Sequence, residues 1–469
     1  MDRSPAARAL TLALATVTAT MTAAASARAQ APAAGDDRYR FAAGASQAVS
    51  LPLTATPAGA RAAWPPAPAA RTGWDTALAG VVIASAGLAE TSWIDVSAGD
   101  GSGNASGDVH VRQHLDAGAR GLRWVNISPL RAALIGGAAL TFETHAATLG
   151  PGAVTVRLFW NGVALERPLL VLAPHPDDAE IAAFGLYAQA RAATIVTVTA
   201  GNAGDANYRN DVPDPAEQYA WKGTLRAMDS VTVPWQGGVP PGRCFNLGYF
   251  DARLQAMHDK PLAVVPELYG PNGDVARYRR VNLSTLLPRK SRTATWAHLV
   301  EDLRRILVKV RPATIVMPHP ILDSHPDHQF VAVAAAEALA TWRAPVTLLL
   351  YTNHAAENLY PYGPADTDVG LPPLQARDLD VQRVYSHPVD RELRRRKLYA
   401  LEAMHDLRLS PAEQSCPPGA RRPDYPRIPE VDYFRRAPRP EELFFAYDRR
   451  GLADLVRDFL AHPPPPDEP

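Results

Sequence analysis

The chain has 469 residues, more than the about 250 to 300 residues at which a single hydrophobic core stops growing, so we expect two domains. Its 48 basic and 48 acidic side chains cancel. The sequence therefore lacks the basic excess of a protein that binds nucleic acid or an anionic membrane surface, and it points to a neutral or small partner.

The N-terminus has the layout of a targeting segment. Arg3 and Arg8 form a short positive region, residues 9–25 are apolar and uncharged, and Ala27-Arg28-Ala29 is a small-x-small cleavage site. We expect residues 1–29 to be a signal peptide that is cleaved after Ala29. The alternative is an uncleaved anchor, although the apolar run is short for the about 20 residues that a spanning helix requires. We expect no later spanning segment, no stable membrane insertion if the signal is cleaved, and a periplasmic or extracellular location.

Two stretches that differ in composition and residue pattern follow. Residues 30–73 are rich in Ala, Pro, Gly and Ser, which predicts an extended linker. In residues 74–166, apolar and polar residues alternate in short runs, such as residues 154–160 before the turn dipeptide Asn161-Gly162. This spacing predicts a small β-sandwich domain. Tryptophans in such a domain are either core residues or platforms for sugar rings, and the candidates are Trp93, Trp124 and Trp160.

Between residues 167 and 461, apolar runs that suit buried strands alternate with segments of helical spacing. The helical face is clearest in residues 296–310, and the expected strands lie at residues 169–173, 194–199, 313–317 and 346–351. This alternation predicts an α/β domain with a Rossmann-like parallel sheet and helices on both faces. The proline-rich residues 462–469 are expected to form a disordered tail.

Polar side chains gather directly after two of the expected strands. His175-Pro176-Asp177-Asp178 follows the first strand, and the loop after the strand at residues 313–317 carries His319, Asp323, His325, Asp327 and His328. Open α/β sheets place their sites at the carboxyl ends of strands. Each motif alone also has a structural explanation, because Asp178 can be a helix N-cap and Pro176 a turn residue.

The two motifs together resemble the signatures of one family. HPDD at residues 175–178 and HPDH at residues 325–328 are similar to those of the PIG-L/LmbE-like zinc-dependent N-acetylglucosaminyl deacetylases. LGYFD at residues 247–251 resembles that family's LGYPD segment, and Arg311-Pro312 before a strand resembles its RPD lead. The resemblance runs from residue 168 to about residue 409, half of the chain.

The resemblance implies a role for each matching residue. His175, Asp178 and His328 would bind one Zn²⁺ per chain, or another divalent metal, and leave a position open for water. Asp177 would be the general base, and His325 would stabilise the oxyanion as an imidazolium. Asp327, between the two histidines of its motif, would orient one of them.

Substrate contacts are predicted from position. Asp251 matches the aspartate of the family's LGYPD segment, while Asn353 and His354 follow the strand at residues 346–351 at the same sheet edge. His319 and Asp323 lie near the expected site, although loop residues of this kind are usually solvated.

The chain also departs from the family pattern. Glu180 stands one residue later than the glutamate that follows HPDD in many members, and Phe184 replaces a glycine of the usual GxGG, which would narrow the pocket. Asn202 and Asp205 stand where a glutamate is usual, and His405 falls one residue late in the C-terminal helix. These departures weaken the inference of substrate identity and leave the metal site untouched.

Cys244 and Cys416 are the two cysteines. One disulfide that closes a long loop and two buried thiols are both compatible with an exported protein.

The sequence thus predicts an exported, metal-dependent hydrolase that removes the N-acetyl group from an N-acetylated amino sugar in a glycan or glycoconjugate. One alternative is an amidohydrolase on the same scaffold that removes a different acyl group. The other is a catalytically silent glycan-binding protein. The binding-protein alternative is disfavoured because the chain keeps every expected catalytic and metal-binding residue, and a pure binder needs no general base. These residues are His175, Asp177, Asp178, His325 and His328.

Overall fold

A computed structural model gives the fold of most of the chain. It describes residues 35–57, 59–65, 73–88, 91–99, 109–290, 292–355, 359–374, 377–407 and 433–462. The expected signal peptide, Cys416 and residues 463–469 lie outside the described residues. Within the described ranges, no helix is both long and apolar enough to cross a membrane.

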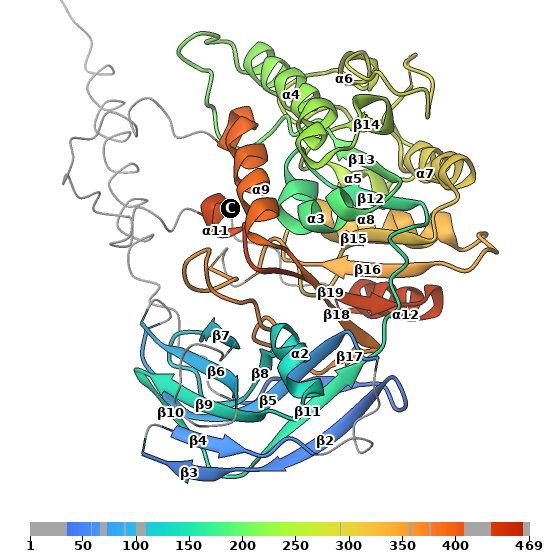
Figure 1. Cartoon of the computed structure of the whole chain (residues 1–469). Coiled ribbons are helices and arrows are strands. Elements are labelled where there is room, and N and C mark those ends of the chain that lie inside the picture. The colour runs from blue at the N-terminus through green and yellow to red at the C-terminus, as the bar shows by residue number, and fades with distance from the viewer. Residues whose placement is uncertain are drawn as a thin grey trace, which may run out of the picture.

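The N-terminal part consists of two antiparallel sheets that share one core (Figure 1). One sheet has the order β10-β5-β11-β2, with β8 also paired to β5, and the other has the order β3-β4-β9-β6-β7. Strand β6 shows why these residues form a sandwich, since Ile94, Val96 and Ala98 are buried and their neighbours are not. The bounds are β2 Ser46–Pro52, β3 Thr54–Thr56, β4 Gly59–Ala62, β5 Thr76–Ala86, β6 Trp93–Gly99, β7 Val109–His114, β8 Gly121–Asn126, β9 Ala139–His145, β10 Ala147–Leu149 and β11 Ala153–Phe159.

For the described part of residues 30–73, the prediction of a linker is wrong. Strands β1 (Tyr39–Phe41), β2, β3 and β4 lie in this range, and the last three belong to the sandwich. In β4 the inward positions are occupied by Ala60 and Ala62, which are buried. Alanine is too weakly apolar to produce a visible alternation, so strand periodicity was hidden by composition.

The C-terminal part is built on a seven-stranded sheet of order β14-β13-β12-β15-β16-β19-β18. The first five strands pair in parallel, whereas β19 pairs antiparallel with both β16 and β18. The two antiparallel strands were not predicted. The bounds are β12 Leu169–Ala173, β13 Ala193–Thr199, β14 Cys244–Tyr249, β15 Thr314–Pro318, β16 Thr347–Tyr351, β18 Arg383–Pro388 and β19 Glu441–Tyr447.

Helices cover both faces of this sheet (Figure 1). In β12, Leu170 and Leu172 face a core with α7, α8 and α12, while Leu169 and Val171 face a core with α3 and α9. Strands buried on both faces read as continuous apolar runs, which is why their sequences stood out. The bounds are α3 Asp178–Gln189, α4 Pro215–Thr232, α5 Leu254–Asp259, α6 Ala276–Arg279, α7 Trp296–Val310, α8 Pro326–Leu339, α9 Arg391–Ala403 and α12 Arg449–Ala461.

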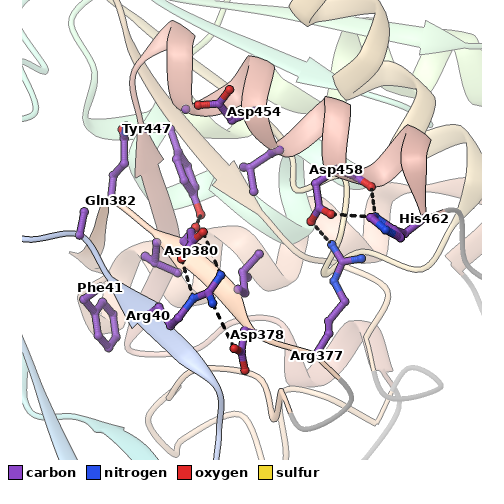
Figure 2. A pocket seen from close by; sticks show the side chains of 15 residues that line it. Arg40, Phe41, Arg377, Asp378, Asp380, Gln382, Tyr447, Asp454, Asp458 and His462 are labelled. Atoms are coloured by element: carbon purple, nitrogen blue, oxygen red, sulfur yellow. Dashed lines mark hydrogen bonds and ion pairs between the residues drawn. The ribbon is translucent and has the colours of Figure 1, made fainter.

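The two parts meet along β1, which pairs in parallel with β17 (Leu379–Val381). Figure 2 shows the groove beside this junction, about 660 Å³ in volume. Arg40 pairs there with Asp378 and Asp380, and Arg377 pairs with Asp458. Both arginines of the groove therefore have a carboxylate partner, as expected of a junction between two packed parts.

The predicted tryptophans have different environments. Trp124 is buried where the two parts meet and packs edge-on against Phe41, so it is a core residue. Trp160 is partly buried against the sandwich core. Trp93 is partly buried and stacks on His145, with the ring centroids 4.0 Å apart.

Candidate metal centre

The first motif forms the turn between β12 and α3. The backbone N–H of His175 donates to Oδ2 of Asp178 at 2.8 Å, which closes the turn and brings both side chains to one side. Asp177 has φ 123°, a left-handed conformation that costs free energy for a residue other than glycine. The turn thus holds HPDD in one strained shape at the carboxyl end of a buried strand.

The second motif forms the start of α8. His325 is the N-cap residue, and its Nδ1 accepts a hydrogen bond from the backbone N–H of Asp327 at 3.2 Å. His328 follows in the first helical turn and is completely buried. Because β12 and β15 are adjacent parallel strands, the two motifs emerge side by side.

Three side-chain atoms from the two motifs form a small triangle. Nδ1 of His175 lies 3.4 Å from Oδ2 of Asp178 and 3.2 Å from Nε2 of His328, and the third side, from Asp178 to His328, is 3.1 Å. Ligands about 2.0 Å from a tetrahedral zinc ion are about 3.3 Å apart. The donor set and its spacing therefore fit a divalent metal.

The other ring nitrogens of these histidines face carboxylates. Nδ1 of His328 lies 3.0 Å from Asp323, and Nε2 of His175 lies 3.2 Å from both Asp251 and Asp327. Carboxylates in this position fix the ring orientation and the tautomer of a metal-binding histidine.

Residues 170–339 match the family model described as PIG-L: GlcNAc-PI de-N-acetylase. The chain contains a PIG-L domain. No curated protein matches the chain. The match covers both motifs and the candidate metal centre.

Two solved structures show weak likeness. One is GalB, the 4-carboxy-2-hydroxymuconate hydratase from Pseudomonas putida KT2440, at 15% identity over 51% of this chain and 79% of that chain, with a TM-score of 0.28. The other is the CBM22-1-GH10 portion of the xylanase Xyn10B from Clostridium thermocellum, at 9% identity over 67% and 79%, with a TM-score of 0.18. Both TM-scores are too low to establish a shared fold.

In the PIG-L domain, the side chain of Asp327 faces His175 of the first motif, whereas its backbone N–H donates to Nδ1 of His325. Its carboxylate accepts from the backbone N–H groups of Ala252 and Leu254 and contacts His175. The contact with its own motif is thus made by the backbone of Asp327, and the carboxylate contacts the first motif instead. The loop between β14 and α5 supplies two donors that draw the side chain across the site, a tertiary contact that local spacing does not reveal.

Two of the predicted substrate contacts lie against the candidate ligands. Nδ2 of Asn353 donates to Oδ1 of Asp178 at 2.7 Å, and Asp251 contacts His175. The His354 ring lies 4.7 Å from the His328 ring and 5.2 Å from the His325 ring, by ring centroids. Asn353 and Asp251 thus hold two of the candidate ligands, Asp178 and His175, in place. Contact of all three residues with substrate stays a prediction.

The surroundings of His325 favour the neutral ring in the metal-free chain, and its role as an imidazolium stays a prediction. Burial and the neighbouring imidazoles of His175, His328 and His354 lower the pKa of His325 to about 2. Since its Nδ1 accepts a hydrogen bond, the proton of the neutral ring belongs on Nε2.

The pKa values of the two candidate histidine ligands are shifted in the opposite direction. Burial lowers the pKa of His328, but Asp178 and Asp323 outweigh it and raise the pKa to about 9. The pKa of His175 is raised in the same way by Asp251 and Asp178, again against burial. Without metal, positive charge on the histidines balances the buried carboxylates.

Sequence reasoning missed Arg226. Its Nη2 donates to Oδ2 of Asp177 at 3.0 Å and to the backbone carbonyl of Pro176 at 2.9 Å. Arg226 lies in α4, 49 residues from Asp177, and belongs to none of the motifs recognised in the sequence. Only the packing of α4 beside the first motif reveals it.

Three weaker expectations are also resolved. Asp323 is a buried partner of His328, and its spacing of five residues before that histidine was the available signal. His319 is structural, because its Nδ1 accepts from the N–H groups of Ile321 and Leu322. Phe184 is fully buried in the core and does not narrow a pocket.

The cysteine prediction stays open. Cys244 is buried in β14, and Cys416 lies outside the described residues.

Proposed function

We propose that the PIG-L domain is a metal-dependent N-deacetylase that removes the acetyl group from an N-acetylated amino sugar. The observation that carries the proposal is the triangle of His175, Asp178 and His328, with sides of 3.1 to 3.4 Å. The family described as GlcNAc-PI de-N-acetylase supports the class of substrate.

These three residues would hold the metal, with zinc as the expected ion. When bound, such an ion polarises the amide carbonyl and makes water a better nucleophile near neutral pH. The protein contributes the buried carboxylates behind each imidazole, which keep the rings in the binding tautomer.

Asp177 is the proposed general base. Its carboxylate takes the proton from the attacking water and returns it to the leaving amine, so that the amide is replaced by a free amine and acetate. Arg226 holds this carboxylate at 3.0 Å and thereby limits its rotation. The strained turn at Asp177 adds a second restraint on the position of the base.

His325 is the proposed donor to the oxyanion. With its Nδ1 occupied by the N–H of Asp327, the neutral ring presents Nε2–H as a hydrogen-bond donor. A fixed donor of this kind stabilises the negative charge that develops on the carbonyl oxygen.

The finer assignments of fold and location are part of the proposal. In chain order, the five parallel strands lie as third, second, first, fourth and fifth, the order of a Rossmann-like sheet, and the two motifs follow the first and fourth strands. We place the domain boundary between the sandwich and the PIG-L domain near residue 167. The composition of residues 1–29 supports export to the periplasm or the medium.

Acetate release from N-acetylhexosamine oligomers by the metal-loaded full chain tests the function. Asp177→Asn keeps the shape of the side chain and removes its basicity, so we expect about a hundredfold loss of activity or more. Asp259→Asn is the matched control, because Asp259 is exposed and lies outside the centre. No acetate despite bound metal would favour a different acyl group. A native protein that neither binds metal nor releases acetate would favour the function of a glycan-binding protein.

A further inference from the structure

A second pocket lies beside the first turns of α4 and is separate from the junction groove of Figure 2. Its volume is about 640 Å³, large enough for a small organic ligand. Helices α4 and α6 lie side by side at this end of the molecule (Figure 1). The pocket is lined by Ala216, Glu217, Ala220, Trp221, Thr224, Glu267, Pro271, Asn272 and Arg277.

Trp221 is the largest apolar group of this pocket and is 54% exposed. A single exposed aromatic residue is common on protein surfaces and proves little by itself. Here, however, the indole lies among groups that carry hydrogen-bond donors and acceptors, among them Glu217, Asn272 and Arg277. The combination suits a ligand with one apolar face and a polar rim.

The pocket is connected to the metal centre by helix α4. This helix begins after the loop that leaves the carboxyl end of β13, the sheet edge that carries the HPDD turn. Trp221 and Arg226 are five residues apart on α4, a rise of about 7.5 Å along the helix axis. The residue that contacts Asp177 and the tryptophan of the pocket thus belong to one rigid element.

A chain of hydrogen bonds makes a second connection. Glu267, which lines the pocket, lies 3.3 Å from Nδ2 of Asn202. Oδ1 of Asn202 accepts from the backbone N–H of Asp251 at 3.1 Å, and Asp251 lies 3.2 Å from His175. The pocket wall is therefore part of the shell that supports the metal centre.

We propose that this pocket is a subsite for a further sugar ring of an oligosaccharide substrate, with the ring stacked on Trp221. A sugar ring presents C–H groups on its faces and hydroxyls around its rim, which match an indole surrounded by polar side chains. Two glutamates against one arginine disfavour an anionic ligand, so the subsite selects a neutral glycan over a phosphorylated lipid headgroup. The proposal rests on the deacetylase function and specifies its substrate as a chain of sugars.

The test compares Trp221→Ala with Trp235→Ala in the metal-loaded full chain. Trp235 is 68% exposed on the short helix η3 (Val233–Gly237) and does not line the pocket, so it controls for loss of a surface tryptophan. We expect Trp221→Ala to lower kcat/KM for a tetramer of N-acetylglucosamine about tenfold and to leave the monomer unchanged. Equal effects on tetramer and monomer, or no effect on either, would overturn the subsite.

Calorimetric titration of the tetramer into Asp177→Asn protein separates the two proposals. Weaker binding after Trp221→Ala supports the subsite even if no variant releases acetate, an outcome that would reject only the deacetylase function. Acetate release together with unchanged tetramer binding in Trp221→Ala would reject only the subsite. Tighter binding of an N-acetylglucosamine phosphate headgroup than of the neutral tetramer would also reject it.

Discussion

Asp323 and His328 form a buried pair in which the carboxylate lies 3.0 Å from Nδ1 of the imidazole, and both side chains are fully shielded from water. The same oxygen of Asp323 accepts from the backbone N–H groups of Asn353 and His354. Three donors thus converge on one carboxylate oxygen, and the opposite nitrogen of His328 is directed at Asp178. The pair fixes the orientation of the second motif at the candidate metal centre.

Replacement of Asp323 by asparagine should weaken metal binding about 10- to 100-fold. In the native protein, one oxygen of Asp323 faces His328 and two backbone N–H groups, and the other oxygen accepts from the N–H of His325. An asparagine has only one accepting atom, so in either orientation its NH₂ group must face one of these donors. Competition with a chelator measures the affinity, and Asp380→Asn in the junction groove is the control. Unchanged affinity in Asp323→Asn would show that the His328 ring is oriented by other contacts.

Metal affinity should rise with pH across the neutral range. The pKa of His328 is raised to about 9, so below that pH a metal must displace a proton from this ring. Each displaced proton weakens apparent binding by up to about tenfold for each pH unit lost. Dissociation constants measured between about pH 6 and about pH 9 check this expectation. Affinity that is flat in this range would mean that His328 binds no proton in the metal-free chain.

The two motifs could be recognised from the sequence because each follows a strand that is buried on both faces. Leu169–Ala173 and Thr314–Pro318 are completely buried, so their apolar residues form uninterrupted runs that end at the polar loops. Parallel strands then deliver both loops to one edge of the sheet. Local sequence therefore suffices to predict which side chains gather there.

The contacts behind the ligands could not be predicted in the same way. Asp327 faces His175 because the loop after β14 supplies two backbone donors, and Arg226 reaches Asp177 from a helix 49 residues away. Strand β4 escaped notice because alanines occupy its inward positions. Such contacts depend on packing between distant segments, and a strand such as β4 is missed because alanine is too weakly hydrophobic to show an alternating pattern.

Arg226 should act on the proposed general base, Asp177, through both charge and geometry. We expect Arg226→Gln to lower kcat and to move the acidic limb of the kcat/KM profile to higher pH, because the cation that favours ionised Asp177 is lost. Arg226→Lys keeps the charge but not the planar guanidinium, whose Nη2 contacts Asp177 and Pro176 while Nη1 donates to the backbone carbonyl of Gly201. We therefore expect the lysine variant to have the acidic limb of the native kcat/KM profile but a kcat between those of the native protein and the glutamine variant. Identical pH profiles in all three proteins would leave Arg226 with a structural role alone.

Asp37 should make the stability of the two-part structure dependent on pH. Its backbone N–H donates to Leu122 of the sandwich, and its Oδ1 accepts from the N–H of Leu374 in the C-terminal part. Burial raises the pKa of Asp37 from 3.8 to about 7, although Arg123, 3.9 Å away, opposes the shift. The folded chain therefore keeps a proton that the unfolded chain loses between these two values.

The sign of the effect follows from this difference in protonation. The contribution of Asp37 to the free energy of unfolding is fully present below about pH 4 and is lost as the pH rises to about 7. Asp37→Asn is neutral at every pH and keeps an oxygen that can accept from Leu374, so its stability should fall less over this range. Thermal unfolding of both proteins between about pH 4.5 and pH 8 measures the difference. If the thermal unfolding midpoints of the two proteins fell by the same amount over this pH range, Asp37 would be ionised in the folded protein throughout it, with Arg123 stabilising the charge.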